Sequence, residues 1–230
     1  MHNVLITGAN RGIGLEHARQ YAAQGARVFA TARDVADAAE LQTLAGQSNG
    51  LVSVHHYDAA MTGAAEELKG AIGDQALDLL LANAGTMGAY VRLADVEADS
   101  VLDTFRINAL APLMLAKAFA PNVIASERKL MAFQSSLMGS IEDNGSGGAY
   151  AYRISKVSLN MIARTVARDL ASNGVIVVTL HPGWVQTRMG GPSAKVSVEK
   201  CVEGQQTLLD GLTKSQSGRF FNYDGRELPW

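Results

Sequence analysis

The stretch Thr7-Gly8-Ala9-Asn10-Arg11-Gly12-Ile13-Gly14 joins a short apolar run at Val4–Thr7 to an amphipathic segment near Gly12–Gln24. A glycine-rich turn between a strand and a helix is where helix N-terminal amides bind the phosphates of a dinucleotide. Gly8 permits a tight turn, Gly12 lets the backbone approach a pyrophosphate, and Gly14 allows close packing of helix on strand. A tight turn without a ligand is the alternative. The residues that we expect to bind the cofactor here are Gly8, Asn10, Arg11, Gly12, Ile13 and Gly14.

Beyond this turn, short apolar runs alternate with longer amphipathic segments, a pattern typical of βαβ units. Several runs lack polar alternation, as strands covered by helices on both faces should. We predict one α/β domain over residues 1–230, a Rossmann fold with a doubly wound, seven-stranded parallel sheet. The expected strands are Val4–Thr7, Arg27–Thr31, Val52–His56, Leu77–Ala82, Lys129–Gln134, Val175–His181 and Arg219–Asn222. The expected helices are near Gly12–Gln24, Val35–Ala45, Met61–Ile72, Ser100–Ser126, Tyr150–Ser172 and Ser197–Gly211.

Composition narrows the class of protein further. The 230 residues are 47% hydrophobic and 18% charged, enough for one sizeable core and against a disordered chain. The 20 basic and 22 acidic residues are spread throughout, so we expect no nucleic-acid partner. We read no apolar stretch of about 18 residues and no leader segment, which favours a cytoplasmic protein without a membrane partner. The single cysteine, Cys201, excludes an internal disulfide, and we expect no metal.

The end of the second expected strand bears on the choice of cofactor. An acidic residue there would bind the 2′-hydroxyl of NAD, whereas a guanidinium can bind the 2′-phosphate of NADP. Arg33, helped by Arg11, therefore predicts NADP(H). Asp34 is contrary evidence, but it precedes the helix expected at Val35 and is more simply a cap. Asp58, after the third strand, could accept from the adenine amino group or stabilise a turn.

Tyr152 and Lys156 lie four residues apart in an expected helix and so share one face. A phenol titrates near pH 10, so proton transfer near neutrality needs a nearby cation, which Lys156 can supply. Ser136, after the fifth strand, could hydrogen-bond a substrate oxygen. A Tyr–Lys pair alone is weak evidence, because surface pairs of this kind are common, but beside the glycine turn it indicates catalysis.

These residues, taken together, resemble the short-chain dehydrogenase/reductase family along essentially the whole chain. The resemblance is carried by Thr7-Gly8-x-x-x-Gly12-x-Gly14, Asn83-Ala84-Gly85, Asn108, Ser136, Tyr152-x-x-x-Lys156 and Pro182-Gly183-Trp184-Val185-Gln186-Thr187. A closer resemblance, to C-factor and sniffer-like carbonyl reductases, is carried by residues 135–141, 144–148 and 220–225. Tyr152 lies 16 positions after Ser136, a few more than the family pattern, which leaves Ser135 and Ser140 as alternatives to Ser136.

The resemblance implies roles for individual residues. Asn108, Ser136, Tyr152 and Lys156 would form the catalytic tetrad: Ser136 orients a carbonyl, Tyr152 protonates it, and Lys156 lowers the phenol pKa and binds the nicotinamide ribose. Asn108 would anchor a water, or simply satisfy a backbone group. The cofactor would also contact Asn83, Ala84 and Gly85 on its adenosine side and Pro182, Gly183, Val185 and Thr187 at the nicotinamide. Thr187 could instead cap a short helix.

The implied activity is NADP(H)-dependent hydride transfer between nicotinamide and a small-molecule carbonyl or secondary alcohol. A C-factor-type signalling protein that binds dinucleotide with little turnover is the alternative. We expect substrate loops near residues 137–149 and 184–196, with an apolar wall drawn from Met87, Tyr90, Met138, Trp184 and Met189, for which generic packing is the alternative. The resemblance also implies a possible homodimer or homotetramer.

Overall fold

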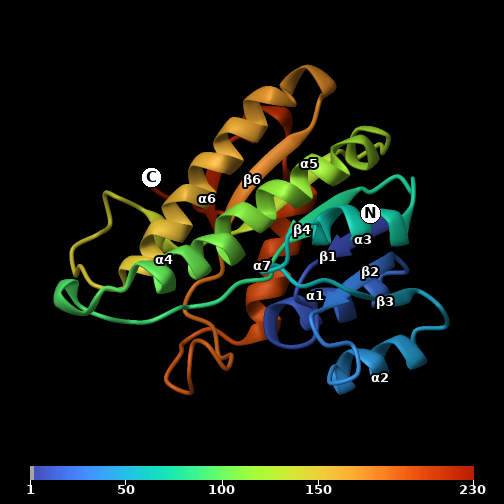
Figure 1. The fold of residues 1–230 in the computed structure, drawn as a ribbon. Coiled ribbons are helices and arrows are strands. Elements are labelled where there is room, and N and C mark those ends of the chain that lie inside the picture. Colours follow the sequence, from blue (N-terminus) through green and yellow to red (C-terminus); the bar gives the residue numbers. More distant parts are fainter. Residues whose placement is uncertain (1–2) are drawn as a thin grey trace.

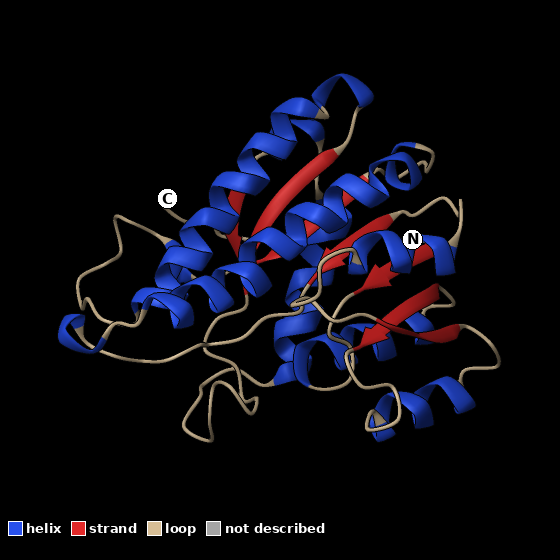
Figure 2. Ribbon diagram, viewed as in Figure 1, coloured by secondary structure: helices blue, strands red, loops and turns tan. Residues whose placement is uncertain are grey.

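A computed structural model describes residues 3–230 as seven parallel strands with helices on both faces (Figures 1 and 2). The strands lie in the order β3-β2-β1-β4-β5-β6-β7. They are β1 (Asn3–Ile6), β2 (Arg27–Ala32), β3 (Val52–His56), β4 (Leu79–Ala82), β5 (Leu130–Gln134), β6 (Ile176–His181) and β7 (Arg219–Asn222). The helices are α1 (Gly12–Ala23), α2 (Ala39–Gln47), α3 (Ala64–Ile72), α4 (Ala98–Phe105), α5 (Ala111–Ile124), α6 (Tyr150–Asp169) and α7 (Val198–Gly211).

Successive side chains of the strands β1, β2, β4, β5 and β6 enter two separate hydrophobic cores. On β1, Val4 and Ile6 pack with α1, α2 and α7, whereas Leu5 packs with α3, α5 and α6. All three side chains are completely buried. Because both faces of the sheet are covered, the strands carry apolar residues at consecutive positions, as the sequence predicted.

The strand order places a crevice between β1 and β4. From β1 the chain builds outward to β2 and β3, then crosses back to pair β4 with the other side of β1. Ligands of doubly wound sheets bind where the order reverses, beyond the carboxyl ends of the strands. The glycine turn after β1 and residues 83–85 after β4 both lie at this point.

The predicted fold class is confirmed, with local differences in the helices. The helix expected at Val35–Ala45 begins only at Ala39, because Asp34 Oδ1 accepts hydrogen bonds from Ala36 and Asp37 N–H and forms a separate turn. The segment expected as one helix at Ser100–Ser126 is α4 and α5 joined by a π-helical turn at Arg106–Leu110. On the surface of α4 and α6, the apolar side chains of Leu102, Ile154 and Met161 are exposed. The homodimer or homotetramer that the resemblance implies stays a prediction.

The continuous helical segment Ala98–Ile124 corrects one reading of the sequence. It is 27 residues long and apolar enough to cross a membrane by length and composition, although we read no such stretch. Half of its most apolar window is buried inside the protein, and Leu115 and Phe119 pack in the core against β4 and β5. These contacts are those of a core helix.

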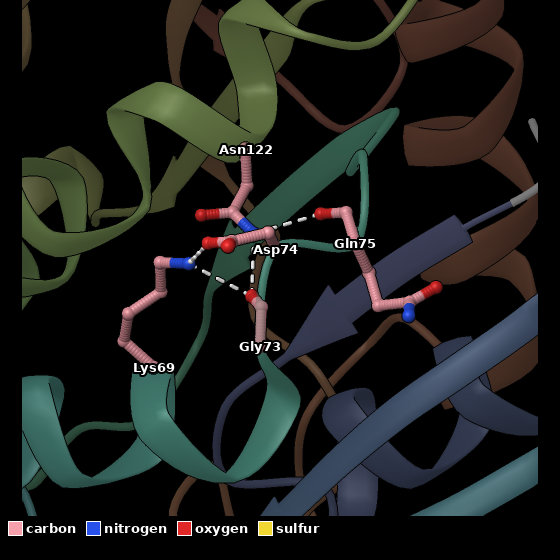
Figure 3. A network of polar contacts seen from close by, with 5 residues as sticks. All are labelled: Lys69, Gly73, Asp74, Gln75 and Asn122. Atoms are coloured by element: carbon pink, nitrogen blue, oxygen red, sulfur yellow. Dashed lines mark hydrogen bonds and ion pairs between the residues drawn. The ribbon is translucent and has the colours of Figure 1, made fainter.

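A polar network fixes the opposite, amino-terminal edge of the sheet (Figure 3). Lys69 at the end of α3 donates to the Gly73 carbonyl at 2.8 Å and pairs with Asp74 at 2.6 Å. Asn122 of α5 donates to the carbonyls of Gly73 and Gln75 at 2.9 and 2.7 Å. The loop leading into β4 is thus tied to both helices, which fixes the strand that ends at the crevice.

Candidate active site

The glycine turn is built as the sequence predicted. Gly8 has a φ of +66°, a left-handed conformation that favours glycine. A Cβ on Gly14 would lie 2.3 Å from the Gly8 carbonyl oxygen, so only glycine lets α1 pack this closely on the turn. Arg11 precedes α1 in an extended conformation, and its side chain makes no capping hydrogen bond. The N-terminal amides of α1 therefore face the crevice without a side-chain acceptor, as anion binding requires.

Thr7 joins this turn to the segment after β4. Its hydroxyl accepts hydrogen bonds from the N–H groups of Asn83 and Ala84, both at 3.1 Å. The Asn83 amide donates back to the carbonyls of Thr7 and Gly8 at 2.9 and 3.2 Å. The structure thus brings Gly8 and the predicted Asn83–Gly85 segment together. Thr7, which the sequence indicated only as part of the glycine motif, therefore also binds the segment after β4.

The residues expected to select the cofactor lie beyond β2 and β3. Arg33 and Arg11 are exposed, and neither guanidinium pairs with a carboxylate of residues 3–230. Asp34 is used in its own turn, in agreement with a local capping role. Asp58 Oδ1 accepts from Ala60 N–H at 2.9 Å, so it stabilises a turn; contact with adenine stays a prediction.

Tyr152, on the first turn of α6, is buried against Ser136, which follows β5. Burial raises the pKa of the Tyr152 phenol, and its hydrogen bond with Ser136 acts in the opposite direction. The two alternative serines are engaged elsewhere: Ser135 Oγ donates to Asn160 Oδ1 at 2.6 Å, and Ser140 Oγ donates to the Trp230 carbonyl at 3.0 Å. Of the three serines, Ser136 is the one that meets the phenol.

Lys156 lies one turn further along α6 and is 4% exposed. Its Nζ donates to the Gln134 carbonyl at 2.7 Å and lies 5.6 Å from the centroid of the Tyr152 ring. Burial lowers the pKa of Lys156 to about 8, so the ammonium is the major form at neutral pH. Sequence reasoning expected this cation to lower the phenol pKa, but in the protein alone burial dominates and raises it.

Asn108 sits in the π-helical turn between α4 and α5 and is completely buried. Its Oδ1 accepts from Thr86 N–H and its Nδ2 donates to the Thr86 carbonyl, both at 2.8 Å. Nδ2 also donates to Ser155 Oγ at 3.0 Å, and Ser155 donates to the Tyr152 carbonyl. Asn108 therefore satisfies a backbone group, the plainer of its two expected roles, while joining the β4 segment to α6. Thr86 and Ser155 were not identified from the sequence as residues of the site. The position of Ser155, three residues after Tyr152 in the same helix, was a signal that could have identified it.

The segment after β6 reaches over the glycine turn. Thr187 Cγ2 lies 3.4 Å from the position that a Cβ on Gly12 would occupy. Residues 184–196 form a closed loop: Val196 N–H donates to the Trp184 carbonyl at 3.0 Å, and Gln186 N–H donates to the Val196 carbonyl at 2.9 Å. The structure thus brings the predicted segment Pro182, Gly183, Val185 and Thr187 alongside the dinucleotide turn.

The expected apolar wall is largely exposed. Tyr90, Trp184 and Met189 are each about half exposed or more, so they are not core residues, while Met87 and Met138 are half-buried. Cys201 lies on α7 in the core, and burial raises the pKa of its thiol to about 12. No group of three metal-ligating side chains occurs within residues 3–230.

Comparison with known proteins gives the class. A model of the short chain dehydrogenase family matches residues 2–197. The C-signal of Myxococcus xanthus is 46% identical over 154 residues, 67% of this chain and 93% of its own. The carbonyl reductase Sniffer of D. melanogaster has a TM-score of 0.93 at 34% identity, with both chains fully covered.

A second solved structure, the NADPH-bound carbonyl reductase from chicken fatty liver, has a TM-score of 0.94 at 31% identity and covers 100% of this chain and 99% of its own. The chain belongs to the short-chain dehydrogenase/reductase family. The predicted family is confirmed, as is the likeness to C-factor and sniffer-like members.

Proposed function

We propose that the protein is an NADP(H)-dependent carbonyl reductase that transfers hydride between nicotinamide and a small-molecule carbonyl or secondary alcohol. The observation that carries this is the buried contact of Tyr152 with Ser136, with Lys156 one helical turn away, beyond the carboxyl end of β5. NADPH in the chicken carbonyl reductase, a fold neighbour, supports the choice of cofactor.

The residues present fit such a cofactor. The uncapped N-terminus of α1 suits a pyrophosphate, and Gly14 packs closely on the Gly8 carbonyl with no side chain of its own in the way. Arg33 and Arg11 are exposed near the end of β2 and the start of α1, where a 2′-phosphate would be bound. One of the three Lys156 N–H groups donates to the Gln134 carbonyl, which leaves two donors for ribose hydroxyls.

NADPH, when bound, supplies the hydride. Tyr152 donates the proton to the carbonyl oxygen, and its high pKa keeps the phenol protonated and ready to act as the acid in reduction. Ser136 Oγ hydrogen-bonds the same oxygen and holds it toward the phenol. The Lys156 ammonium stabilises the phenolate left after proton transfer. Asn108, through Ser155 and Thr86, keeps α6 and the β4 segment in register around these groups.

The likeness to the C-signal raises a second candidate, a signalling protein that binds dinucleotide with little turnover. Ser136, Tyr152 and Lys156 argue against it, because a binding module has no use for a buried phenol beside a buried ammonium. Such burial costs free energy and is typical of catalytic sites.

The test is turnover of NADPH with a panel of ketones, aldehydes and quinones. Tyr152→Phe should abolish turnover and leave the NADPH dissociation constant nearly unchanged, because only the proton is lost. Lys156→Ala should lower turnover and also weaken NADPH binding, since Lys156 stabilises the phenolate and binds the ribose. Tyr57→Phe is a matched control, because Tyr57 is also a buried tyrosine but follows β3. Substantial turnover by Tyr152→Phe would contradict the proposal.

A further inference from the structure

The Ser136 hydroxyl must be held in place for the proposed reaction, and the backbone on both sides of it is bonded to the end of β6. Ser135 N–H donates to the Leu180 carbonyl at 2.7 Å. Leu137 N–H donates to Nδ1 of the His181 ring at 3.2 Å. Two consecutive residues of β6 therefore accept hydrogen bonds from the residues on either side of Ser136. Leu180 accepts through its main-chain carbonyl, and His181 accepts through its imidazole ring.

The turn that follows Ser136 depends on the same anchor. Ser136 Oγ accepts from Met138 N–H at 3.2 Å and begins the 3₁₀ turn Leu137–Gly139. The far end of this turn is held by Asn160 Nδ2, which donates to the Gly139 carbonyl at 3.2 Å. The hydrogen bond from Leu137 N–H to His181 holds the first residue of this turn. The orientation of the Ser136 hydroxyl thus follows from a turn fixed at both ends.

We propose that His181 is a positioning residue, whose Nδ1 accepts the Leu137 N–H bond and thereby holds the Ser136 hydroxyl against the Tyr152 phenol. Because His181 directly precedes Pro182–Gly183, it also joins the serine turn to the segment expected to meet the nicotinamide. The bond requires a neutral ring with its proton on Nε2, since a protonated Nδ1 would oppose the amide instead of accepting from it. The inference rests on the proposed function for its kinetic consequence only.

The surroundings keep the ring neutral. Burial lowers the pKa of His181 to about 4. Asp143, in the loop after the serine turn, and Asp224, after β7, act in the opposite direction, and Arg226 acts with burial. The acceptor therefore persists through the neutral range and is lost only in acid.

The experiment compares His181→Asn with His181→Leu. The Oδ1 of asparagine can replace Nδ1 as acceptor, whereas leucine accepts nothing. In the protein without cofactor, amide hydrogen exchange at Leu137 should rise at least ~10-fold in His181→Leu and stay within ~3-fold of wild type in His181→Asn. Nitrogen-15 shifts of the wild-type ring should show the Nε2–H tautomer. His17→Leu, a buried histidine bonded to Gln205, is the matched control and should leave Leu137 unchanged.

In turnover, His181→Leu should lower kcat by ~10-fold or more with an NADPH dissociation constant within ~2-fold of wild type, and His181→Asn should recover most of the rate. Acid inactivation near pH 4 should be weaker in His181→Asn, which has no ring to protonate. If His181→Leu does not fold, the pH titration of the Leu137 amide shift in wild type against His181→Asn replaces it. Equal loss in both variants, unchanged Leu137 exchange, or identical titrations would overturn the inference. Absence of turnover in the wild type would contradict the proposed function, while the exchange and tautomer measurements would still decide the role of His181.

Discussion

At the scale of single residues, cofactor choice depends on one exposed guanidinium. Arg33 directly follows β2 and has no carboxylate partner within residues 3–230, so it is free for a 2′-phosphate. We expect NADPH to bind more tightly than NADH by about 2–4 kcal/mol if Arg11 also reaches the phosphate. Arg33→Asp should erase or invert this preference, measured by fluorescence titration of both cofactors. Arg27→Asp, at the other end of β2, is the control and should keep it.

The charge of Lys156 predicts a pH dependence. Burial places its pKa at about 8, so the ammonium is intact below that pH and lost above it. The rate of carbonyl reduction at saturating NADPH should therefore fall as the pH rises through about 8. Lys156→Arg keeps the positive charge at all these pH values, and any activity that it retains should lack this decline. A decline of the same shape in Lys156→Arg would assign the titration to another group.

At the scale of elements, the loop 184–196 is closed at its base by main-chain hydrogen bonds. Trp184, Gln186 and Val196 make these bonds, and Arg188 and Met189 lie further along the loop with exposed side chains. Thr187 lies over Gly12, where a bound cofactor would meet the loop. We expect amide hydrogen exchange at residues 187–194 to slow when NADPH binds, with little change at the base. Unchanged exchange at saturating NADPH would remove the support for Thr187 as a cofactor contact.

Strands and the glycine turn could be predicted from the sequence because both depend on local patterns. Apolar runs such as Val175–His181 are too long for a turn and therefore predict buried strands. Gly8 is required by its left-handed φ of +66°, and Gly14 is required by its close approach to the Gly8 carbonyl within the same βα unit. The break at Arg106–Leu110 could not be predicted, because a π-helical turn leaves no signal in hydrophobic periodicity. The same holds for Asp34, whose side chain bonds stop α2 from starting earlier.

Within the site, Tyr152 and Lys156 were predictable from spacing, since α6 alone brings them together. His181 and Ser155 were not singled out, because their roles depend on partners 44 and 47 residues away in the chain. The dominance of burial over charge at Tyr152 was equally invisible, since it depends on how completely α6 is covered.

At the scale of the whole molecule, buried histidines predict sensitivity to acid. His17 of α1 is completely buried, and burial lowers its pKa from 6.5 to about 4. Between these values the unfolded chain binds a proton that the folded chain does not, so stability falls as the pH falls from about 6.5 toward 4. His17 alone should reduce the free energy of unfolding by about 2 kcal/mol between pH 7 and pH 5.

Denaturant unfolding at both pH values checks this. The difference in unfolding free energy between pH 7 and pH 5 should shrink by about 2 kcal/mol in His17→Leu, whatever the variant does to stability at pH 7. His56→Leu, which removes an exposed histidine at the end of β3, is the control. A pH dependence in His17→Leu identical to that of wild type would mean that folding does not change the pKa of His17.

The π-helical turn at Arg106–Leu110 has a consequence for insertions and deletions. Each residue of a helix advances the chain by about 100° around its axis, and a π turn holds one residue more than a regular turn. Deleting one residue there, such as the exposed Leu110, would let α4 and α5 join as one regular helix. Either Asn108 would then rotate away from Thr86 and Ser155, or Leu115 and Phe119 would rotate out of the core. Deletion or insertion of one residue in this segment should therefore be tolerated far less well than substitution of its exposed residue Leu110.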